Sequence, residues 1–398
     1  MDPSTARLVT SADGLSLIDS LPPYSEPDAL SLGAGLRKAG ADGQSVAAAM
    51  TQSRLRAAAR SKFGEFADGM LFTQDGLEQA TRLSVAALHA TRFREAGCTR
   101  IADLTAGIGA DAMAASALGL PVVAFELDEA TALIADHNLR HWPETQVVHA
   151  DSIKTLNAPG AVAALGIDGI FADPARRNAR GRRHDPKDYS PALDAVLALR
   201  EMVPELGVKV GPAIDHDAIP TDVEAQWVSV DGSVVEASLW SGKLARFIGH
   251  TALVISDGQA HHLEGTTDRA PEGALAEYIY EPDGAVIRSG LVGEVAATIG
   301  AHLVDPSIAY LTCDSEMATP FARGYRVLDS LPYSVKRLAS ALHAREVGIV
   351  DIKKRGIDIT PERLRPQLKL RGDAHAMVIL TRIAGRHQAL IVEPLDRH

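Results

Sequence analysis

The chain has 398 residues, of which 46% are hydrophobic and 23% charged, and its formal net charge is −11. This composition is typical of a folded globular protein, the length predicts more than one domain, and no apolar run approaches the roughly 18 residues that a membrane helix needs. The first residues lack a secretory profile and there are only two cysteines, Cys98 and Cys313, so we expect a cytoplasmic protein without a disulfide framework or a thiolate metal site.

Residues 1–94 are predicted to form a helical N-terminal region. The stretch 45–63, "SVAAAMTQSRLRAAARSKF", places apolar residues at helical spacing and basic residues toward the other faces. A second helix is predicted after Thr73, where "QDGLEQATRLSVAALHATRF" begins with acids and continues with small apolar residues.

From residue 95 to 274 the pattern changes to a Rossmann-like α/β domain. Short apolar strands are predicted at 100–104, 121–126, 145–149, 167–172 and 207–211, with helices at 109–119 and 129–142. Such alternation favours a doubly wound, largely parallel sheet. Beyond residue 224 the sequence is rich in β-strand residues, and we expect antiparallel strands there, with a hairpin turn at Asp231–Gly232.

Two smaller segments are expected to complete the chain. Residues 275–324 are predicted to be a small α/β (ferredoxin-like) segment, and residues 325–398 a separate small α+β domain with strands at 347–354, 376–383 and 388–394. Residues 325–398 contain 14 Lys and Arg against 8 Asp and Glu, so this domain carries +6 and the rest of the chain −17. A basic module on an acidic body favours a polyanion partner, and the alternative is chance clustering on a solvated face.

A glycine motif follows the first predicted strand. Gly107, Gly109 and Ala112 satisfy the pattern G-x-G-x-x-A between a strand and a helix, where backbone N–H groups can approach a ligand. The motif alone fits NAD, FAD or another nucleoside cofactor.

Three carboxylates narrow the choice of cofactor. Asp103, Glu126 and Asp151 are expected at the carboxyl ends of successive strands, the edge where open α/β sheets bind ligands. Asp103 would face a phosphate in a dinucleotide complex but suits a cationic ligand, directly or through water. Glu126 can accept hydrogen bonds from two ribose hydroxyls, and Asp151 can meet an adenine amino group. The alternative for Glu126 and Asp151 is a helix cap or a solvated loop acid.

An arginine-rich loop follows the fourth predicted strand. Asp173 and Pro174 end that strand, and the loop then carries Arg176, Arg177, Arg180, Arg182 and Arg183. Guanidinium groups pair with phosphate and stack on bases, so the loop favours a nucleic-acid contact. The alternative is a solvated basic turn that pairs with acids such as Asp185 and Asp188.

Together, "DLTAGIGADA", "FELDEATALIADHN", "HADS" and "FADPAR" resemble the ordered motifs of class I S-adenosylmethionine-dependent methyltransferases. The stretches 62–82 and 350–372 extend the resemblance to a bacterial group with a helical N-terminal region and a C-terminal THUMP-like domain. The resemblance implies a Rossmann-like methyltransferase sheet, S-adenosyl-L-methionine as cofactor and, because THUMP domains are RNA-binding modules of RNA-modifying enzymes, an RNA partner.

The resemblance and the residues together give a candidate site. The cofactor-binding candidates are Asp103, Thr105, Gly107, Gly109, Glu126, Leu127, Asp151, Ser152 and, from the "GLEQATR" helix, Gln79, with Thr81 beside it. The catalytic candidates are Asp173, Pro174 and Arg176. The candidates for substrate binding are Arg176, Arg177, Arg180, Arg182 and Arg183 in the loop, and Lys353, Lys354 and Arg355 in the C-terminal domain.

The D-P-A-R sequence departs from related patterns. Amino-directed nucleic-acid methyltransferases often place an aromatic ring after Asp/Asn-Pro-Pro, whereas this chain has Ala175 and Arg176. Arg176 could replace the ring in part by stacking. Residues 208–217 contain no cysteine, so covalent carbon methylation is not expected.

The leading hypothesis is therefore an S-adenosylmethionine-dependent methyltransferase that acts on RNA by direct in-line transfer at the D-P-A-R site. The first alternative is a methyltransferase for a small molecule or a protein. Two others are a nicotinamide-dependent oxidoreductase and an RNA-binding protein that has lost catalysis. The histidines show no metal-ligand spacing, so no metal is expected.

Overall fold

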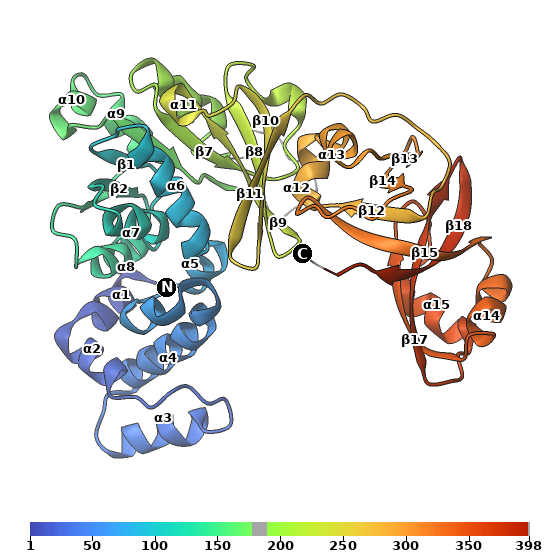
Figure 1. The fold of residues 1–398 in the computed structure, drawn as a ribbon. Helices are drawn as coiled ribbons and strands as arrows, with labels where there is room; N and C mark the ends of the chain where they lie inside the picture. The colour runs from blue at the N-terminus through green and yellow to red at the C-terminus, as the bar shows by residue number, and fades with distance from the viewer. Residues whose placement is uncertain (177–188, 397–398) are drawn as a thin grey trace. The chain divides into compact units, whose positions relative to one another are not determined.

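The structure, a computed structural model, describes residues 1–176 and 189–396 (Figure 1). The chain divides into two compact units. Unit 1 comprises Met1–Val210 and Leu239–Arg246, and unit 2 comprises Gly211–Ser238 and Phe247–His398. No helix in the described ranges is long and apolar enough to cross a membrane.

The N-terminal region of unit 1 is helical, as predicted. Asp42 begins the longest of its helices by accepting the Ser45 N–H at 2.9 Å, and the helix ends before Gly64, whose φ is +58°. The helices are α1 Pro3–Thr10, α2 Ala12–Asp19, α3 Ala29–Lys38, α4 Gly43–Phe63, α5 Gln74–Gln79 and α6 Leu83–Glu95.

The prediction of one continuous helix after Thr73 is wrong, because the chain breaks between α5 and α6. The ammonium group of Lys62 donates to the carbonyl oxygens of Leu77, Glu78 and Ala80 at 2.8, 2.8 and 2.9 Å. These carbonyls would otherwise need the N–H groups of a continuing helix. The break leaves Thr81 buried.

The sheet of unit 1 is parallel and follows the predicted alternation. Its strands are β1 Ile101–Asp103, β2 Val122–Glu126, β3 Gln146–His149, β4 Gly169–Ala172 and β7 Leu206–Val210, in the order β7-β4-β1-β2-β3. From β1 the chain proceeds outward to β2 and β3, then returns to β4 on the other side of β1. The point where the strand order reverses, the usual ligand edge of such sheets, is therefore between β1 and β4. The helices that follow these strands are α7 Ala110–Ala117, α8 Glu129–Leu139, α9 Ser152–Leu156, α10 Ala161–Leu165 and α11 Leu193–Ala198.

The helical region and the sheet of unit 1 share one hydrophobic core. Phe63, Leu71 and Phe72 from the helical region lie in the same buried cluster as Ile101 of β1 and Val122 of β2. The helical region is thus packed against the sheet as part of one folded body.

Unit 2 contains the β-rich segment predicted after residue 224. Its strands are β8 Glu224–Val230, β9 Ser233–Trp240, whose last two residues belong to unit 1, β10 Gly249–Ser256 and β11 Gln259–Gly265, in the order β11-β10-β8-β9. The predicted turn between β8 and β9 is confirmed, with Asp231 and Gly232 at φ +50° and +80°. The expectation of purely antiparallel strands is wrong, because β10 pairs with β8 in parallel.

A second, seven-stranded sheet completes unit 2, and it includes the strands predicted near the C-terminus. Its strands are β12 Tyr278–Pro282, β13 His302–Asp305, β14 Ile308–Cys313, β15 Ala322–Pro332, β16 Val347–Lys354, β17 Ala374–Ile383 and β18 Arg386–Pro394, in the order β13-β14-β12-β15-β18-β17-β16. The accompanying helices are α12 Gly284–Ser289, α13 Val292–Ile299, α14 Val335–His343 and α15 Pro361–Leu368.

Both faces of this sheet are apolar, and neighbouring residues of β17 alternate between them. Val378 and Leu380 belong to a cluster with Leu338 of α14 and Leu364 of α15, whereas Ile379 belongs to a separate cluster with tyrosines of β14 and β15. The sheet runs through both of the segments predicted at 275–324 and 325–398. The four-part domain division therefore remains a proposal about folding units, which limited proteolysis can test.

Candidate active site

The turn after β1 requires glycine at two positions. Gly107 and Gly109 have φ of +54° and +88°, values that disfavour any residue with a side chain. A Cβ at Gly109 would also lie 3.2 Å from the Leu139 side chain. The turn therefore brings its backbone N–H groups to the amino end of α7, at the carboxyl edge of the sheet.

Glu126, at the end of β2, is held by this turn. One of its carboxylate oxygens accepts the N–H of Gly107 at 2.9 Å, and the other accepts the N–H of Asp128 at 2.8 Å. Burial raises the pKa of Glu126, against the two N–H groups, which favour its ionised form. Each carboxylate oxygen keeps a further lone pair, so two hydroxyl groups can still be accepted.

Asp103, the last residue of β1, is a buried carboxyl. It is 3% exposed and accepts the Thr105 N–H at 3.1 Å. Burial first, and the neighbouring Asp111 second, raise the pKa of Asp103 well above its ordinary value. A cavity of about 10 Å³, enough for one water molecule, is lined by Asp103, Asp111 and His89 among others. A cationic group beside Asp103 would favour its ionised form.

The other cofactor-binding candidates lie just after strands: Leu127 follows β2, and Asp151 and Ser152 follow β3 at the start of α9. Asp151 is exposed, and one of its carboxylate oxygens caps α9 by accepting the Lys154 N–H at 3.0 Å. The helix cap, which was the alternative to cofactor binding for this residue, is therefore present. Ser152 is buried, and Leu127 is 66% exposed although it is a large apolar residue. An exposed apolar side chain beside Glu126 is available to cover an apolar part of a ligand.

The end of β4 introduces a residue that the sequence analysis did not identify. The Asp173 carboxylate receives a hydrogen bond from the Lys209 ammonium at 2.7 Å, and the Asp173 N–H donates to the Thr105 hydroxyl at 2.7 Å. Lys209, on β7, also donates to the Thr81 hydroxyl at 3.1 Å. The lysine therefore joins the helical region to the D-P-A-R site. Its signal in the sequence is a lone charge inside the apolar strand "GVKVG".

A second buried pair lies next to this one. His89 of α6 contacts the Asp111 carboxylate through Nδ1 at 3.0 Å, and its ring lies 5.1 Å from that of Phe171 and 5.6 Å from that of Trp240. Burial would raise the pKa of Asp111, but the hydrogen bond from His89 and the charge of Lys209 hold it below its ordinary value. Asp111 thus stays ionised close to Asp103.

Asn138 connects the glycine turn to the helical region, and sequence reasoning missed it as well. Its amide oxygen accepts the Leu71 N–H at 2.8 Å, and its amide nitrogen donates to the carbonyls of Leu71 at 3.0 Å and Ile108 at 2.8 Å. Gln52 holds the next residue of this segment, Phe72, through two hydrogen bonds of 2.8 and 2.9 Å. A buried amide inside the apolar helix pattern is the only signal that the sequence offers.

The remaining candidates differ in their relation to this edge. Gln79 is exposed at the end of α5, and its side chain makes no hydrogen bond within the described residues, whereas Thr81 reaches Lys209. Pro174 is buried, and the backbone of Arg176 pairs with Tyr189 between β5 (Ala175–Arg176) and β6 (Tyr189–Ser190). Four candidates lie outside the described residues: Arg177, Arg180, Arg182 and Arg183.

The three C-terminal candidates lie in unit 2. Lys353 pairs with Glu281, and this bond keeps the pKa of Lys353 above its ordinary value although burial acts against it. Lys354 is exposed, and the Arg355 guanidinium lies 5.7 Å from the centre of the Tyr310 ring. Of these three, Lys354 is exposed and its side chain makes no ion pair or ring contact among the described residues.

Comparison with known proteins identifies relatives over most of the chain. Two proteins of Mycobacterium tuberculosis, from strains CDC 1551 / Oshkosh and ATCC 25618 / H37Rv, are each 34% identical over 339 residues, which cover 83% of this chain and 90% of the relative. Both are named uncharacterized S-adenosylmethionine-dependent methyltransferases.

A solved structure and two sequence families add to this. A crystal structure of a protein from Porphyromonas gingivalis W83, described as a methyltransferase, is similar to this chain with a TM-score of 0.75 and 20% sequence identity. The match covers 94% of this chain and 100% of that protein, so the two share a fold. Residues 322–394 match the family described as THUMP domain-like. Residues 2–59 match a domain of unknown function, DUF8688.

Proposed function

Since the chain belongs to the class I S-adenosylmethionine-dependent methyltransferases, with a THUMP-like region at its C-terminus, we propose that it transfers a methyl group to RNA. The observation that carries the proposed site is the row of carboxyl groups at the ends of β1, β2 and β4, formed by Asp103, Glu126 and Asp173. The family membership also removes the nicotinamide-dependent oxidoreductase from the alternatives.

The residues at this edge fit the cofactor. S-adenosyl-L-methionine, when bound, supplies a methyl group on a positively charged sulfur, attached to an amino acid and a nucleoside. A buried carboxyl with a raised pKa, Asp103, suits the cationic amino-acid part. Glu126 suits the ribose hydroxyls, because its two oxygens are aimed by backbone N–H groups and keep further lone pairs.

On the acceptor side, we assign Asp173 the role of orienting the nucleophile, which belongs to the acceptor. Displacement at a methyl carbon needs alignment of donor and acceptor at about 3 Å more than it needs acid or base catalysis. The Asp173 carboxylate, held at 2.7 Å by Lys209, can accept a hydrogen bond from an attacking amine and direct its lone pair. Pro174 and Arg176 continue the same segment, and Arg176 has the side-chain chemistry to stack on a base.

Two features support RNA as the acceptor. The C-terminal region matches a THUMP-like family over residues 322–394, and residues 325–398 carry a net charge of +6 on a chain of −11. The arginines of residues 176–183 add five positive charges to the D-P-A-R segment. Positive charge of this kind binds phosphate backbones in a salt-dependent way.

The test compares modified nucleosides by mass spectrometry in cells with and without the protein. We expect one methylated nucleoside to be lost on deletion, restored by the wild type and by Asp136→Asn, and not restored by Asp173→Ala. Asp136 is a suitable control because it is exposed on α8, and its side chain makes no hydrogen bond or ion pair within the described residues.

Identical nucleoside profiles in all these strains would contradict RNA as the acceptor. Thermal-shift measurements with S-adenosylhomocysteine then separate a methyltransferase for another acceptor from an RNA-binding protein that has lost catalysis. Stabilisation by S-adenosylhomocysteine would favour a methyltransferase for a small molecule or a protein.

A further inference from the structure

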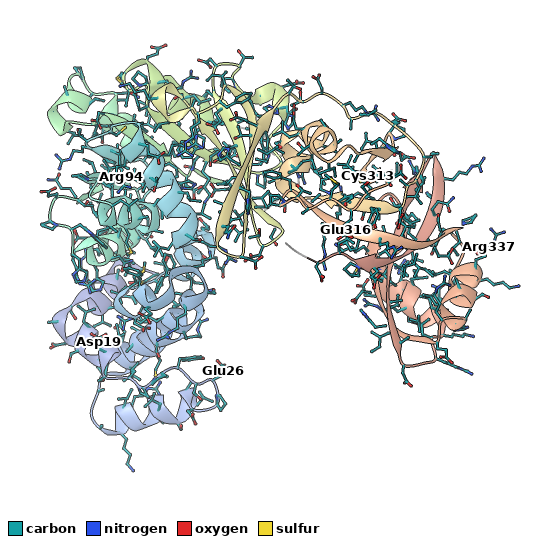
Figure 2. The ribbon with its side chains drawn as sticks, in the orientation of Figure 1. Asp19, Glu26, Arg94, Cys313, Glu316 and Arg337 are labelled. Carbon is teal, nitrogen blue, oxygen red and sulfur yellow. The ribbon has the colours of Figure 1, made fainter. Side chains whose placement is uncertain are left out.

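Unit 2 contains a pocket that is independent of the site in unit 1. It has a volume of about 690 Å³, within the usual range for small-molecule sites, and every residue that lines it belongs to unit 2. Its walls come from the β8–β9 turn, the β10–β11 turn, the loop after β14 and one end of the seven-stranded sheet. Glu316, labelled in Figure 2, lies on that loop.

The seven-stranded sheet curls around the inner wall of this pocket. Lys353 of β16 forms an ion pair with Glu281 of β12, although three strands separate β16 from β12 in the sheet order. The Lys353 ammonium also lies 5.6 Å from the ring centre of Tyr325 on β15. Contacts across so many strands require strong curvature. The mouth of a curled sheet is a common place for a ligand.

Two guanidinium groups line the pocket without an acidic partner. Arg323 lies over the ring of Tyr325 at 5.6 Å and Arg355 over the ring of Tyr310 at 5.7 Å. Within the described ranges, neither side chain makes an ion pair or a hydrogen bond. Stacking on a ring fixes the plane of each guanidinium and leaves its N–H donors free for an anion.

Two buried hydroxyl groups lie beneath these residues. Tyr310 and Tyr325 are 1% and 0% exposed. Glu281 and Lys353, which line the pocket, lie beside them. Burial raises the pKa of both tyrosines, so both hydroxyls stay protonated. The charged wall of the pocket is therefore backed by neutral hydroxyl groups and not by further charges.

The pocket is nevertheless not simply basic. Against Arg323, Arg355 and Lys353 stand six acids: Asp231, Asp257, Glu281, Asp283, Glu316 and Asp396. A bare polyanion would be repelled by this set. A ligand with one anionic group and several hydroxyl or amino donors would satisfy both the guanidinium groups and the carboxylates.

From these observations we infer that the pocket of unit 2 binds a small molecule that carries one phosphate or carboxylate group together with several hydroxyl or amino groups. Arg323 and Arg355 hold the anionic group, and the carboxylates of Asp283 and Glu316 accept hydrogen bonds from the donors. Such a ligand joins the hairpin turns to the sheet, and unit 2 is stabilised when it binds.

The test uses the full chain, saturated with S-adenosylhomocysteine so that the site in unit 1 is filled, and titrates D-ribose 5-phosphate by calorimetry. We expect binding of ribose 5-phosphate that is at least 10-fold tighter than binding of inorganic phosphate or ribose. L-glutamate distinguishes a carboxylate ligand from a phosphate ligand, and its tighter binding would support the carboxylate form.

A neighbouring arginine on β15 provides the control. Arg323→Gln and Arg355→Gln should each reduce the affinity for the probe at least 10-fold. Arg326→Gln removes a neighbouring arginine that pairs with Glu277 outside the pocket, and it should leave the affinity within 2-fold. Circular dichroism and the melting temperature show whether each variant is folded.

Two outcomes would overturn the inference. The first is that folded wild-type protein binds none of the four probes, and the second is that Arg323→Gln and Arg355→Gln bind as well as Arg326→Gln. The methyltransferase proposal is tested separately by the binding of S-adenosylhomocysteine. Binding of ribose 5-phosphate without binding of S-adenosylhomocysteine would contradict the methyltransferase proposal and still support the ligand pocket of unit 2.

Discussion

The sheet edge of unit 1 and the basic C-terminal region of unit 2 carry their charges in opposite ways. In unit 1, Asp103, Asp111 and Asp173 are buried or half-buried, and each accepts a hydrogen bond: Asp103 from the next turn, Asp111 from α6 and Asp173 from β7. In unit 2, a group of exposed bases makes no side-chain ion pair or hydrogen bond among the described residues; it includes Lys336, Arg337 (labelled in Figure 2), Lys354, Lys369 and Arg371.

This difference separates two kinds of binding. Buried, paired charges act at short range, so replacing one disturbs its partner and costs several kcal/mol. Exposed charges act at longer range through solvent, are screened by salt and cost little when removed singly. These properties agree with the proposals made above, a fixed cofactor geometry in unit 1 and a charged partner for the C-terminal region.

The largest effect is expected for Asp103→Ala. Loss of a buried charge that faces a cation should weaken S-adenosylhomocysteine binding by about 100-fold or more, measured by calorimetry, because such losses cost about 3–5 kcal/mol. RNA affinity should stay nearly intact. The exposed Asp136→Ala is the control and should change neither. Equal loss of cofactor and RNA binding would contradict separate sites.

Lys209→Met tests the acceptor side of unit 1. Without the ammonium at 2.7 Å, Asp173 loses its position, and we expect methyl transfer to RNA to fall about 100-fold, as for a misplaced reacting group. Binding of S-adenosylhomocysteine should change less than 3-fold. Lys154→Met, at an exposed site on α9, is the control. A matching fall in cofactor affinity would mean that Lys209 serves the fold and not the acceptor.

Asn138→Ala should reduce the free energy of unfolding of unit 1 by about 2–3 kcal/mol, measured by urea denaturation. The change removes three hydrogen bonds and leaves the Leu71 N–H and two carbonyls buried without partners. If stability were unchanged while cofactor affinity fell, Asn138 would belong to the ligand site and not to the scaffold.

Acid should weaken unit 1 through His137. Burial first, and Arg140 second, lower the pKa of His137 to about 4 in the folded state, from about 6.5 in the unfolded chain. The neutral form favours folding, so the contribution is complete above pH 6.5 and is lost as the pH falls toward 4. We expect about 2 kcal/mol of loss between pH 7 and pH 4.5. His137→Gln should lack this part of the pH dependence.

The smallest effect is expected for Lys354→Ala in the exposed region. RNA affinity should fall about 2–3-fold at low salt and less at high salt, because one phosphate contact is lost. The free energy of unfolding should stay within about 0.5 kcal/mol. Lys353→Ala should in addition destabilise unit 2, since Lys353 pairs with Glu281. If Lys354→Ala and Lys353→Ala lowered the free energy of unfolding equally, the proposed difference between exposed and paired charges would be contradicted.

Much of unit 1 was predictable, and the reasons are local. Strands such as Val122–Glu126 are short apolar runs bounded by turn residues, and the acids that follow them mark the carboxyl edge. Gly107 and Gly109 could be located because only glycine adopts their φ angles easily.

The parts that could not be predicted depend on contacts between distant elements. Lys209 and Asp173 are 36 residues apart, and their pairing follows only from the order β7-β4 in the sheet. The break before Thr81 requires Lys62 to reach the end of α5, and the parallel pairing of β10 with β8 depends on how the chain returns after Trp240.

The side chain of Asn138 has a practical consequence for any shortened version of this protein. Because one amide binds the backbone of both Leu71 and Ile108, the glycine turn is braced by residues that come before the first strand of the sheet. A gene fragment that starts at residue 95 would remove that brace and open the shared core. Expression plasmids and fusion joints should therefore be designed upstream of α1, so that the sheet of unit 1 is produced with its helices.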